Sequence, residues 1–317
     1  MQLVERSFLL EATTGLGAKP RPELIGPVLA NLHQTLQDSV RMGFLHSSRA
    51  RGRMSRGIKR AADVRYIGHT AANEHGTLLR FEVAQFGDVA AQLFEQKELW
   101  DDGPKATETA FELLGAALND VQHRRLESNR FDPMLLKRFS DYGRMFRKGR
   151  LSRIVLTDSA VSEQPIIDSH VVATAHSLSD ATPASRRIRV AGRLDVMGAS
   201  QGILKVQLES GQTVTARWEG PESIDSLNDL FNRNVVCEGV GIFRPSGSLL
   251  RIDADAIARA TSKDAAFGQM PTAIPIHDFQ LEARVRAGEP SPYLAFIGSV
   301  PAEESDEDFA AAIAAMS

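Results

Sequence analysis

The sequence has a single cysteine, Cys237, so the chain can form no internal disulfide bond and no cysteine-based metal site. Aromatic residues make up only 6% of the chain, which leaves few rings to stack on nucleic-acid bases. No apolar run approaches the roughly 20 residues that a membrane helix requires, and the first residues do not have the shape of a secretion signal. We therefore expect a cytoplasmic protein that does not enter a membrane.

Familiar catalytic motifs are missing as well. The sequence contains no Ser-His-Asp motif, no glycine-rich phosphate loop and no dinucleotide fingerprint. Cys237 falls on an expected strand, where a small core residue is a far more common role for cysteine than a nucleophile. These absences favour a non-catalytic protein, and no cofactor is expected.

The net charge of -3 conceals an uneven distribution of charged residues. Residues 41–62 contain no Asp or Glu, and their cations are Arg41, Arg49, Arg51, Arg53, Arg56, Lys59 and Arg60. The segment after Val300 is the reverse, because it carries no Lys or Arg and five acids, which are Glu303, Glu304, Asp306, Glu307 and Asp308. Such an asymmetry predicts two different kinds of partner, or one segment folding against the other.

At 317 residues, with 43% hydrophobic and 24% charged residues, the chain is long enough for about two globular domains. Residues 1–156 mix helical and strand periodicities, which predicts a mixed α/β domain. Its clearest element is a helix that begins at Thr109, because Thr109 and Glu112 have the spacing of a capping box. Residues 157–186 are rich in Ser, Thr and Ala, and we expect a partly ordered linker there.

Residues 187–257 have the pattern of a small closed β-barrel. Apolar residues alternate on both sides of Gly192, which predicts a strand that bends at the glycine. Residues 221–231 switch to helical spacing, with Phe231 on the expected buried face. The order of three strands, a helix and two strands resembles an OB fold. We therefore expect an α+β protein: a mixed α/β N-terminal domain, a small OB-like β-barrel, and an extended segment, residues 258–317, that ends in an acidic tail.

One candidate group for chemistry is His69, Glu74 and His75, which are residue types that bind metals or transfer protons. Their spacing matches no strong metal signature. An exposed polar turn is the favoured interpretation, and no metal site is assigned.

A second group is Asp88, Glu95 and Lys97, which resembles the core of the restriction-endonuclease-like nucleases. The resemblance implies acids that hold a divalent ion and a lysine that stabilises developing charge. A solvated charged face is the favoured interpretation here too.

The cations of residues 41–62 predict an exposed basic arm that neutralises the phosphates of a nucleic acid. Its candidate contact residues are Arg49, Arg51, Arg53, Arg56 and Arg60. Further arginines lead into the barrel, and OB-like barrels commonly present a groove to single strands. Ordinary surface charge is the alternative interpretation.

The acidic tail has the sequence pattern of a short helix. Acids follow the N-cap candidate Ser305, and apolar residues recur at helical spacing, which predicts a short amphipathic helix. The passage resembles the Gly-x-x-Pro-x-x-Glu-x-Asp-Glu ending of small bacterial proteins encoded beside PIN-type ribonuclease toxins. The matching positions are Gly298, Pro301, Glu304, Asp306 and Glu307, with Phe309, Ile313 and Met316 as apolar residues. The resemblance implies a tail that lies along a protein partner, and a solubilising C terminus is the alternative.

Three functions are compatible with these patterns. The first is a non-catalytic, antitoxin-like regulatory protein that binds a protein partner, such as a PIN-type ribonuclease toxin, through the tail. The second is an OB-type nucleic-acid-binding protein, and the third is a metal-dependent nuclease that uses Asp88, Glu95 and Lys97. A homo-oligomer is compatible with each of them.

Overall fold

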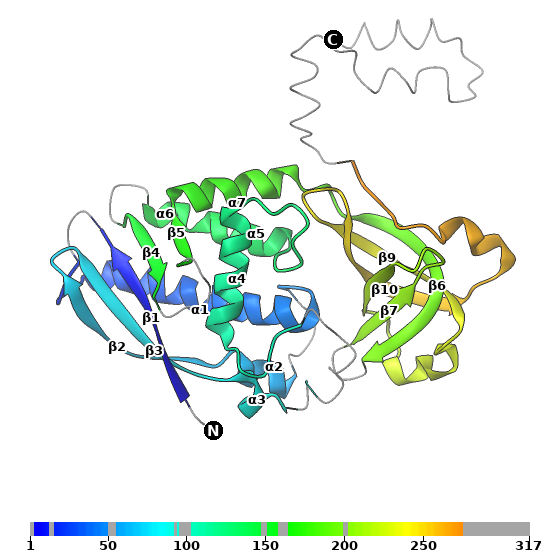
Figure 1. The fold of residues 1–317 in the computed structure, drawn as a ribbon, viewed down its shortest axis with the longest axis horizontal. Coiled ribbons are helices and arrows are strands. Elements are labelled where there is room, and N and C mark those ends of the chain that lie inside the picture. Colours follow the sequence, from blue (N-terminus) through cyan, green and yellow to red (C-terminus); the bar gives the residue numbers. More distant parts are fainter. Residues whose placement is uncertain are drawn as a thin grey trace, which may run out of the picture. The chain divides into compact units, whose positions relative to one another are not determined.

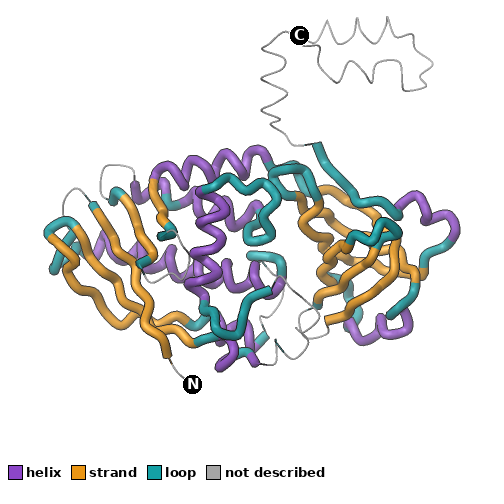
Figure 2. Tube along the Cα trace, in the orientation of Figure 1, coloured by secondary structure: helices purple, strands orange, loops and turns teal. Residues whose placement is uncertain are grey.

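The structure is a computed structural model that describes residues 3–12, 16–49, 55–91, 94, 103–146, 151–157, 164–198 and 202–274. The chain divides into two units, Met1–Pro275 and Ile276–Ser317, and the second lies outside the described residues. Within the first unit, helices and strands form a mixed layer structure that precedes a closed barrel (Figure 2). The expected α+β class is therefore confirmed. Within the described residues, no helix combines the length and the apolar character needed to cross a membrane.

A five-stranded antiparallel sheet forms one layer of the N-terminal part, in the order β2-β3-β1-β4-β5 (Figure 1). Its strands are β1 (Leu3–Glu11), β2 (Val64–Asn73), β3 (Gly76–Ala84), β4 (Arg153–Leu156) and β5 (Ile166–Asp168). β1 is central because it pairs with β3 along its whole length and with β4 over its second half. Charged pairs such as Glu5 with Arg80 lie on the outer face, as is usual for an antiparallel sheet with one solvated side.

Helices cover the other face of this sheet. The helices of the N-terminal part are α1 (Pro22–Leu45), α2 (Arg56–Ala61), α3 (Phe86–Val89), α4 (Ala110–Gln122), α5 (Pro133–Asp141), α6 (Gly143–Phe146) and α7 (Ser169–Ala181). The ring of Phe8 on β1 lies 5.7 Å from Phe81 on β3 and 4.9 Å from Phe111 on α4, so sheet and helices share one core. The capping box expected at Thr109 and Glu112 is present at the start of α4.

The structure contains a strand and a helix within residues 157–186, where a partly ordered linker was expected. Residues 166–181 form β5 and α7, and Val171, Ala175 and Leu178 on α7 are buried in the N-terminal core. The Asp168 side chain caps α7 by accepting a hydrogen bond from the backbone N–H of Val171 at 2.8 Å. The three buried residues have the i, i+4, i+7 spacing of a helical face, but they stand among Ser, Thr and His, and this polar composition favoured a linker.

The barrel is closed by five strands in the order β10-β8-β7-β6-β9. They are β6 (Arg186–Gly198), β7 (Ile203–Gln207), β8 (Thr213–Trp218), β9 (Asn234–Phe243) and β10 (Leu249–Arg259), and the 3₁₀ helix η4 (Ile224–Leu230) lies between β8 and β9 in the chain. β8 and β10 pair in parallel, whereas the other neighbours pair antiparallel. This arrangement is compatible with an OB-like barrel. A second 3₁₀ helix, η5 (Ser262–Phe267), follows β10.

The long strand β6 changes partner near Gly192. Its first half pairs with β9 and its second half with β7, so the strand belongs to both sides of the barrel. A Cβ atom at Gly192 would collide with the backbone carbonyl oxygen of Gln207 on β7. A residue without a Cβ is therefore required where β6 passes this close to β7. Phe231 was expected to be buried but is 46% exposed, because η4 ends at Leu230 and Phe231 is its extended C-cap.

Side chains from β10 connect the barrel with the N-terminal helices. Arg251 donates hydrogen bonds to the backbone carbonyl of His46 at 2.8 Å and to Asp253 at 2.9 Å, and it lies 3.4 Å from Asp132. The neighbouring Leu250 is buried in the N-terminal core. The barrel and the N-terminal helices thus share buried polar and apolar contacts.

Candidate functional site

The described part of the basic arm includes a short helix with an exposed cationic face. Ser55 caps α2 by accepting a hydrogen bond from the N–H of Ile58 at 3.3 Å. Ile58 is buried with Gly57 and Ala61, and this places Arg56, Lys59 and Arg60 on the exposed side. Within the described residues, none of these three side chains forms an ion pair. Arg49 is also exposed, whereas Arg51 and Arg53 lie outside the described residues.

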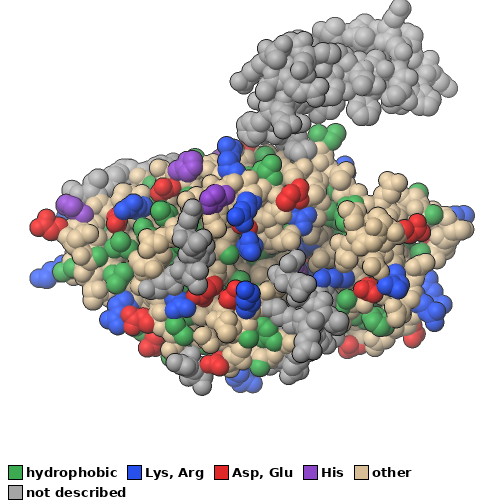
Figure 3. All heavy atoms as spheres, viewed as in Figure 1, with side chains coloured by type: hydrophobic (Ala, Val, Ile, Leu, Met, Phe, Trp, Pro, Cys, Tyr) green, Lys and Arg blue, Asp and Glu red, His purple; other side chains and the backbone are tan. Residues whose placement is uncertain are grey.

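The arginines of the barrel have a different environment. Arg187 donates hydrogen bonds to Glu238 at 2.7 Å and to both carboxylate oxygens of Asp255 at 2.9 Å, and Arg189 also reaches Glu238. The hydrogen bonds from Arg187 and Arg189 hold the pKa of Glu238 below its ordinary value. A phosphate would have to compete with these carboxylates. On the face drawn in Figure 3, basic and acidic side chains are interspersed in the same way.

The aromatic residues of the barrel offer little stacking surface. Phe243 is buried, and the Trp218 ring donates its N–H to the backbone carbonyl of Glu222 at 2.8 Å. Phe231 is the exposed ring among these three. Stacking on several successive bases would require more exposed rings than this.

Cys237 is a core residue, as expected. It is fully buried in the barrel, and burial raises the pKa of its thiol to about 12, with a smaller contribution from the charge of Asp255. Because the thiolate is the reactive form of cysteine, this residue is not a nucleophile at neutral pH.

The remaining candidate groups are not assembled into a site by the described residues. His69 lies on β2, where its Nδ1 is 2.7 Å from the hydroxyl of Tyr66, while Glu74 and His75 form the turn between β2 and β3. Across the described ranges, no three His, Cys, Asp or Glu side chains are grouped so that they could hold a metal ion. Asp88 lies on α3, and Glu95 and Lys97 fall outside the described residues.

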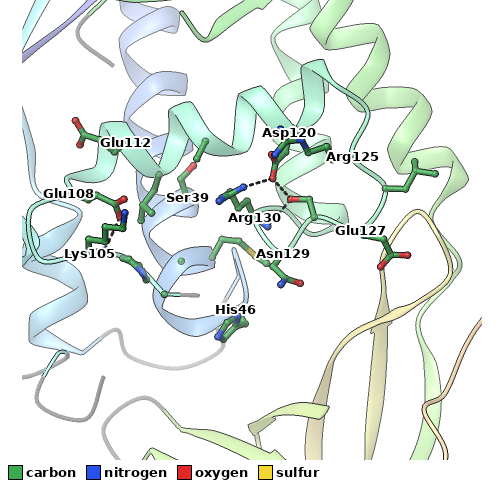
Figure 4. A pocket seen from close by; sticks show the side chains of 18 residues that line it. Ser39, His46, Lys105, Glu108, Glu112, Asp120, Arg125, Glu127, Asn129 and Arg130 are labelled. Carbon is green, nitrogen blue, oxygen red and sulfur yellow. Dashed lines mark hydrogen bonds and ion pairs between the residues drawn. The ribbon is translucent and has the colours of Figure 1, made fainter. Parts of the chain in front are cut away.

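A cavity of about 720 Å³ lies beside α1 and α4 and the loop that follows α4 (Figure 4). Its apolar wall includes Met42 from α1 and Leu113 and Ala116 from α4. Ser39, also on α1, is a lining residue whose hydroxyl oxygen is buried and has no hydrogen-bond partner among the described residues. A volume in this range is typical of small-molecule sites.

One end of the cavity is built around Asp120, near the end of α4. This buried carboxylate accepts hydrogen bonds from Ser128 at 2.6 Å, Arg130 at 2.9 Å and Arg125 at 3.0 Å, all from the loop after α4 (Figure 4). Each of the two arginine side chains is about half exposed. Asp120 therefore fixes two guanidinium groups at the cavity surface.

The sequence patterns did not reveal this cavity. Its walls come from two helices far apart in the chain, and only their association places Ser39 beside Leu113 and Ala116. One local signal was present, since Arg125 and Arg130 lie at and beyond the end of the helix expected from the capping box. A scan against protein-family models and searches of curated proteins and of solved structures find no match for this chain.

Proposed function

We propose that this protein is a non-catalytic nucleic-acid-binding protein that contacts phosphates through its basic arm. The observation that carries the proposal is the exposed face of α2, where Arg56, Lys59 and Arg60 have no carboxylate partner among the described residues. These side chains lie in a segment of 22 residues, 41–62, without a single acid. Unpaired cations of this kind gain the most from replacing counterions at phosphates.

The environment of the barrel residues indicates how the protein contacts a nucleic acid. The barrel is compatible with an OB-like fold, but its arginines are engaged by Glu238 and Asp255, and few of its rings are exposed. Contacts to the phosphate backbone position a protein on a nucleic acid without reading its sequence. We therefore expect binding that depends strongly on salt and only weakly on sequence.

Fluorescence anisotropy with a labelled single-stranded oligonucleotide tests this proposal. The variant Arg56→Gln/Lys59→Gln/Arg60→Gln should weaken binding at low salt and reduce the slope of log affinity against log salt by about 2, as expected for three lost contacts to a single strand. The matched control, Arg187→Gln/Arg189→Gln/Arg193→Gln, removes the same charge from the barrel and should change binding much less. Equal losses in both variants, or no binding of the unaltered protein at low salt, would contradict the proposal.

The antitoxin-like function is a second proposal. It is favoured by the division of the chain after Pro275, which separates the acidic tail from the unit that contains the sheet and the barrel. The proposed contact residues, which lie outside the described residues, are Glu304, Asp306, Glu307, Phe309, Ile313 and Met316. In this proposal the folded part is a scaffold, and the tail binds a small protein such as a ribonuclease toxin.

Affinity purification from the native host, with and without residues 298–317, tests the tail. A stoichiometric small protein that is lost on truncation, and also with Phe309→Asp/Ile313→Asp, would support it. Co-purification that is unchanged by both alterations would refute it. The described residues favour no third function, since only Asp88 of the nuclease candidates lies among them.

A further inference from the structure

The cavity beside α1 and α4 is separate from the residues used in both proposals. Its lining comes from α1, from α4 and from the loop after α4, and it includes Arg125 and Arg130. The hydroxyl oxygen of Ser39 is fully buried in the wall, so it does not face a ligand in the cavity. A volume of about 720 Å³ is large enough for a small-molecule ligand.

The charge at one end of the cavity is positive. Asp120 is a single carboxylate, but it holds both Arg125 and Arg130. One guanidinium charge therefore stays uncompensated within this cluster, and both groups remain half exposed. Guanidinium groups held in a fixed orientation are well suited to bidentate hydrogen bonds with phosphate oxygens.

Three other acids line the cavity, Glu108, Glu112 and Glu127, and each has a cation near it. Glu108 accepts from the backbone N–H of Lys105 at 2.8 Å, and Lys105 also lines the cavity. Glu112 accepts from Arg6 at 2.7 Å and from the backbone N–H and the hydroxyl of Thr109. Glu127 accepts from Ser248 at 2.6 Å. Although burial acts in the opposite direction, the hydrogen bonds to Glu127 and the charge of Arg244 lower its pKa.

The body of the cavity is suited to a flat, partly apolar group. Met42, Leu113 and Ala116 supply an apolar wall. The helical residues from Glu112 to Asp120 span about 12 Å along α4 at 1.5 Å per residue. The cavity thus combines an anion-binding end with an apolar body of similar length to a mononucleotide.

We propose that this cavity binds a nucleoside phosphate, with the phosphate on Arg125 and Arg130 and the base against Met42, Leu113 and Ala116. This site is distinct from the basic arm, so it would remain if the protein did not bind nucleic acid polymers.

Isothermal titration calorimetry on the full chain, without divalent metal, tests the site with AMP, ATP, adenosine and inorganic triphosphate. AMP and ATP should bind, and adenosine should bind at least tenfold more weakly because it lacks the anion. Triphosphate binding as tight as that of ATP would overturn the assignment to a nucleotide. Absence of heat with both AMP and ATP at millimolar concentration would overturn the site itself.

Two variants locate the binding. Arg130→Gln should weaken AMP binding at least tenfold, while Arg124→Gln, which removes the same charge from the same loop outside the cavity lining, should leave it unchanged. Ala116→Phe fills the cavity without a change of charge and should abolish binding. Circular dichroism confirms that each variant is folded. Equal effects of Arg124→Gln and Arg130→Gln, or unaltered binding by Ala116→Phe, would refute the location.

A third variant separates this inference from the proposed function. The α2 variant Arg56→Gln/Lys59→Gln/Arg60→Gln should retain AMP binding even where it loses the oligonucleotide. Loss of both ligands in this variant would mean that AMP binds at the basic arm rather than in the cavity.

Discussion

Arg251 on β10 provides a test of how much its buried contacts with the N-terminal helices contribute to stability. We predict that Arg251→Met lowers the free energy of unfolding by about 3 kcal/mol, close to the lower limit for breaking a buried ion pair. The arginine side chain is 6% exposed and that of Asp132 is 2% exposed, so water replaces few of the lost contacts. Met is unbranched and fills much of the same volume.

The size of the expected stability loss follows from the hydrogen bonds that His46 and Asp132 retain without Arg251. His46 ends α1, and its carbonyl loses the hydrogen bond from Arg251 at the C terminus of that helix. Asp132 keeps four other donors, which are the backbone N–H and hydroxyl of Ser48 and the N–H groups of Met134 and Leu135. Because its charge remains stabilised by these donors, the loss falls near the lower end of the range of 3–5 kcal/mol that is usual for buried pairs.

Urea denaturation followed by both tryptophan fluorescence and far-UV circular dichroism measures the effect. The matched control is Arg187→Met, which also removes three hydrogen bonds, but from a side chain that is 55% exposed. Exposed ion pairs contribute about 0–1 kcal/mol, so this variant should lose much less stability. A loss below about 1 kcal/mol for Arg251→Met, or equal losses in the two variants, would refute the reasoning that burial decides the outcome.

Two further predictions concern the barrel. Gly192→Ala places a Cβ against the carbonyl of Gln207 and should cost about 2 kcal/mol, as overpacking does, whereas Gly198→Ala in the same strand meets its nearest atom at 3.5 Å and should change stability by less than about 0.5 kcal/mol in the same denaturation assay. Cys237 should react with a thiol reagent at neutral pH only after unfolding. Since burial raises its folded pKa from 9.0 to about 12, its contribution to stability is present below pH 9 and is lost as pH rises from about 9 to about 12. Cys237→Ala should therefore reduce the loss of stability between pH 8 and pH 10 by about 1 kcal/mol, and an unchanged loss would contradict the assignment.

The barrel and α4 were predictable from the sequence because their signals are local. Alternating apolar residues, the glycine at 192 and the capping box at Thr109 each specify a backbone geometry through neighbours in the chain. The same reasoning missed α7, whose core contacts are made by Val171, Ala175 and Leu178 among polar residues. Their spacing is helical, but the surrounding Ser, Thr and His favoured a linker, and the structure shows that α7 packs against α5.

The cavity and the junction at Arg251 could not be predicted for a different reason. Arg251 lies on a strand with outward-facing charges, and nothing in its neighbourhood in the chain shows that the N-terminal helices bury it. Ser39 likewise lies on an ordinary amphipathic helix. In both cases the environment is created by segments more than 70 residues apart, such as Asp132 with Arg251 and Ser39 with Leu113.

Three arginine environments differ in the number of carboxylates per guanidinium, and this difference predicts where anions bind. Arg187 has two acids as partners, so an arriving anion must displace a carboxylate. Arg125 and Arg130 share one acid, which orients them and still leaves net positive charge in a cavity. Arg56 on α2 forms no ion pair within the described residues and is exposed, so it attracts anions without orienting them. The count of carboxylates per guanidinium, rather than the number of basic residues, therefore assigns a small oriented anion to the cavity and an extended polyanion to the basic arm.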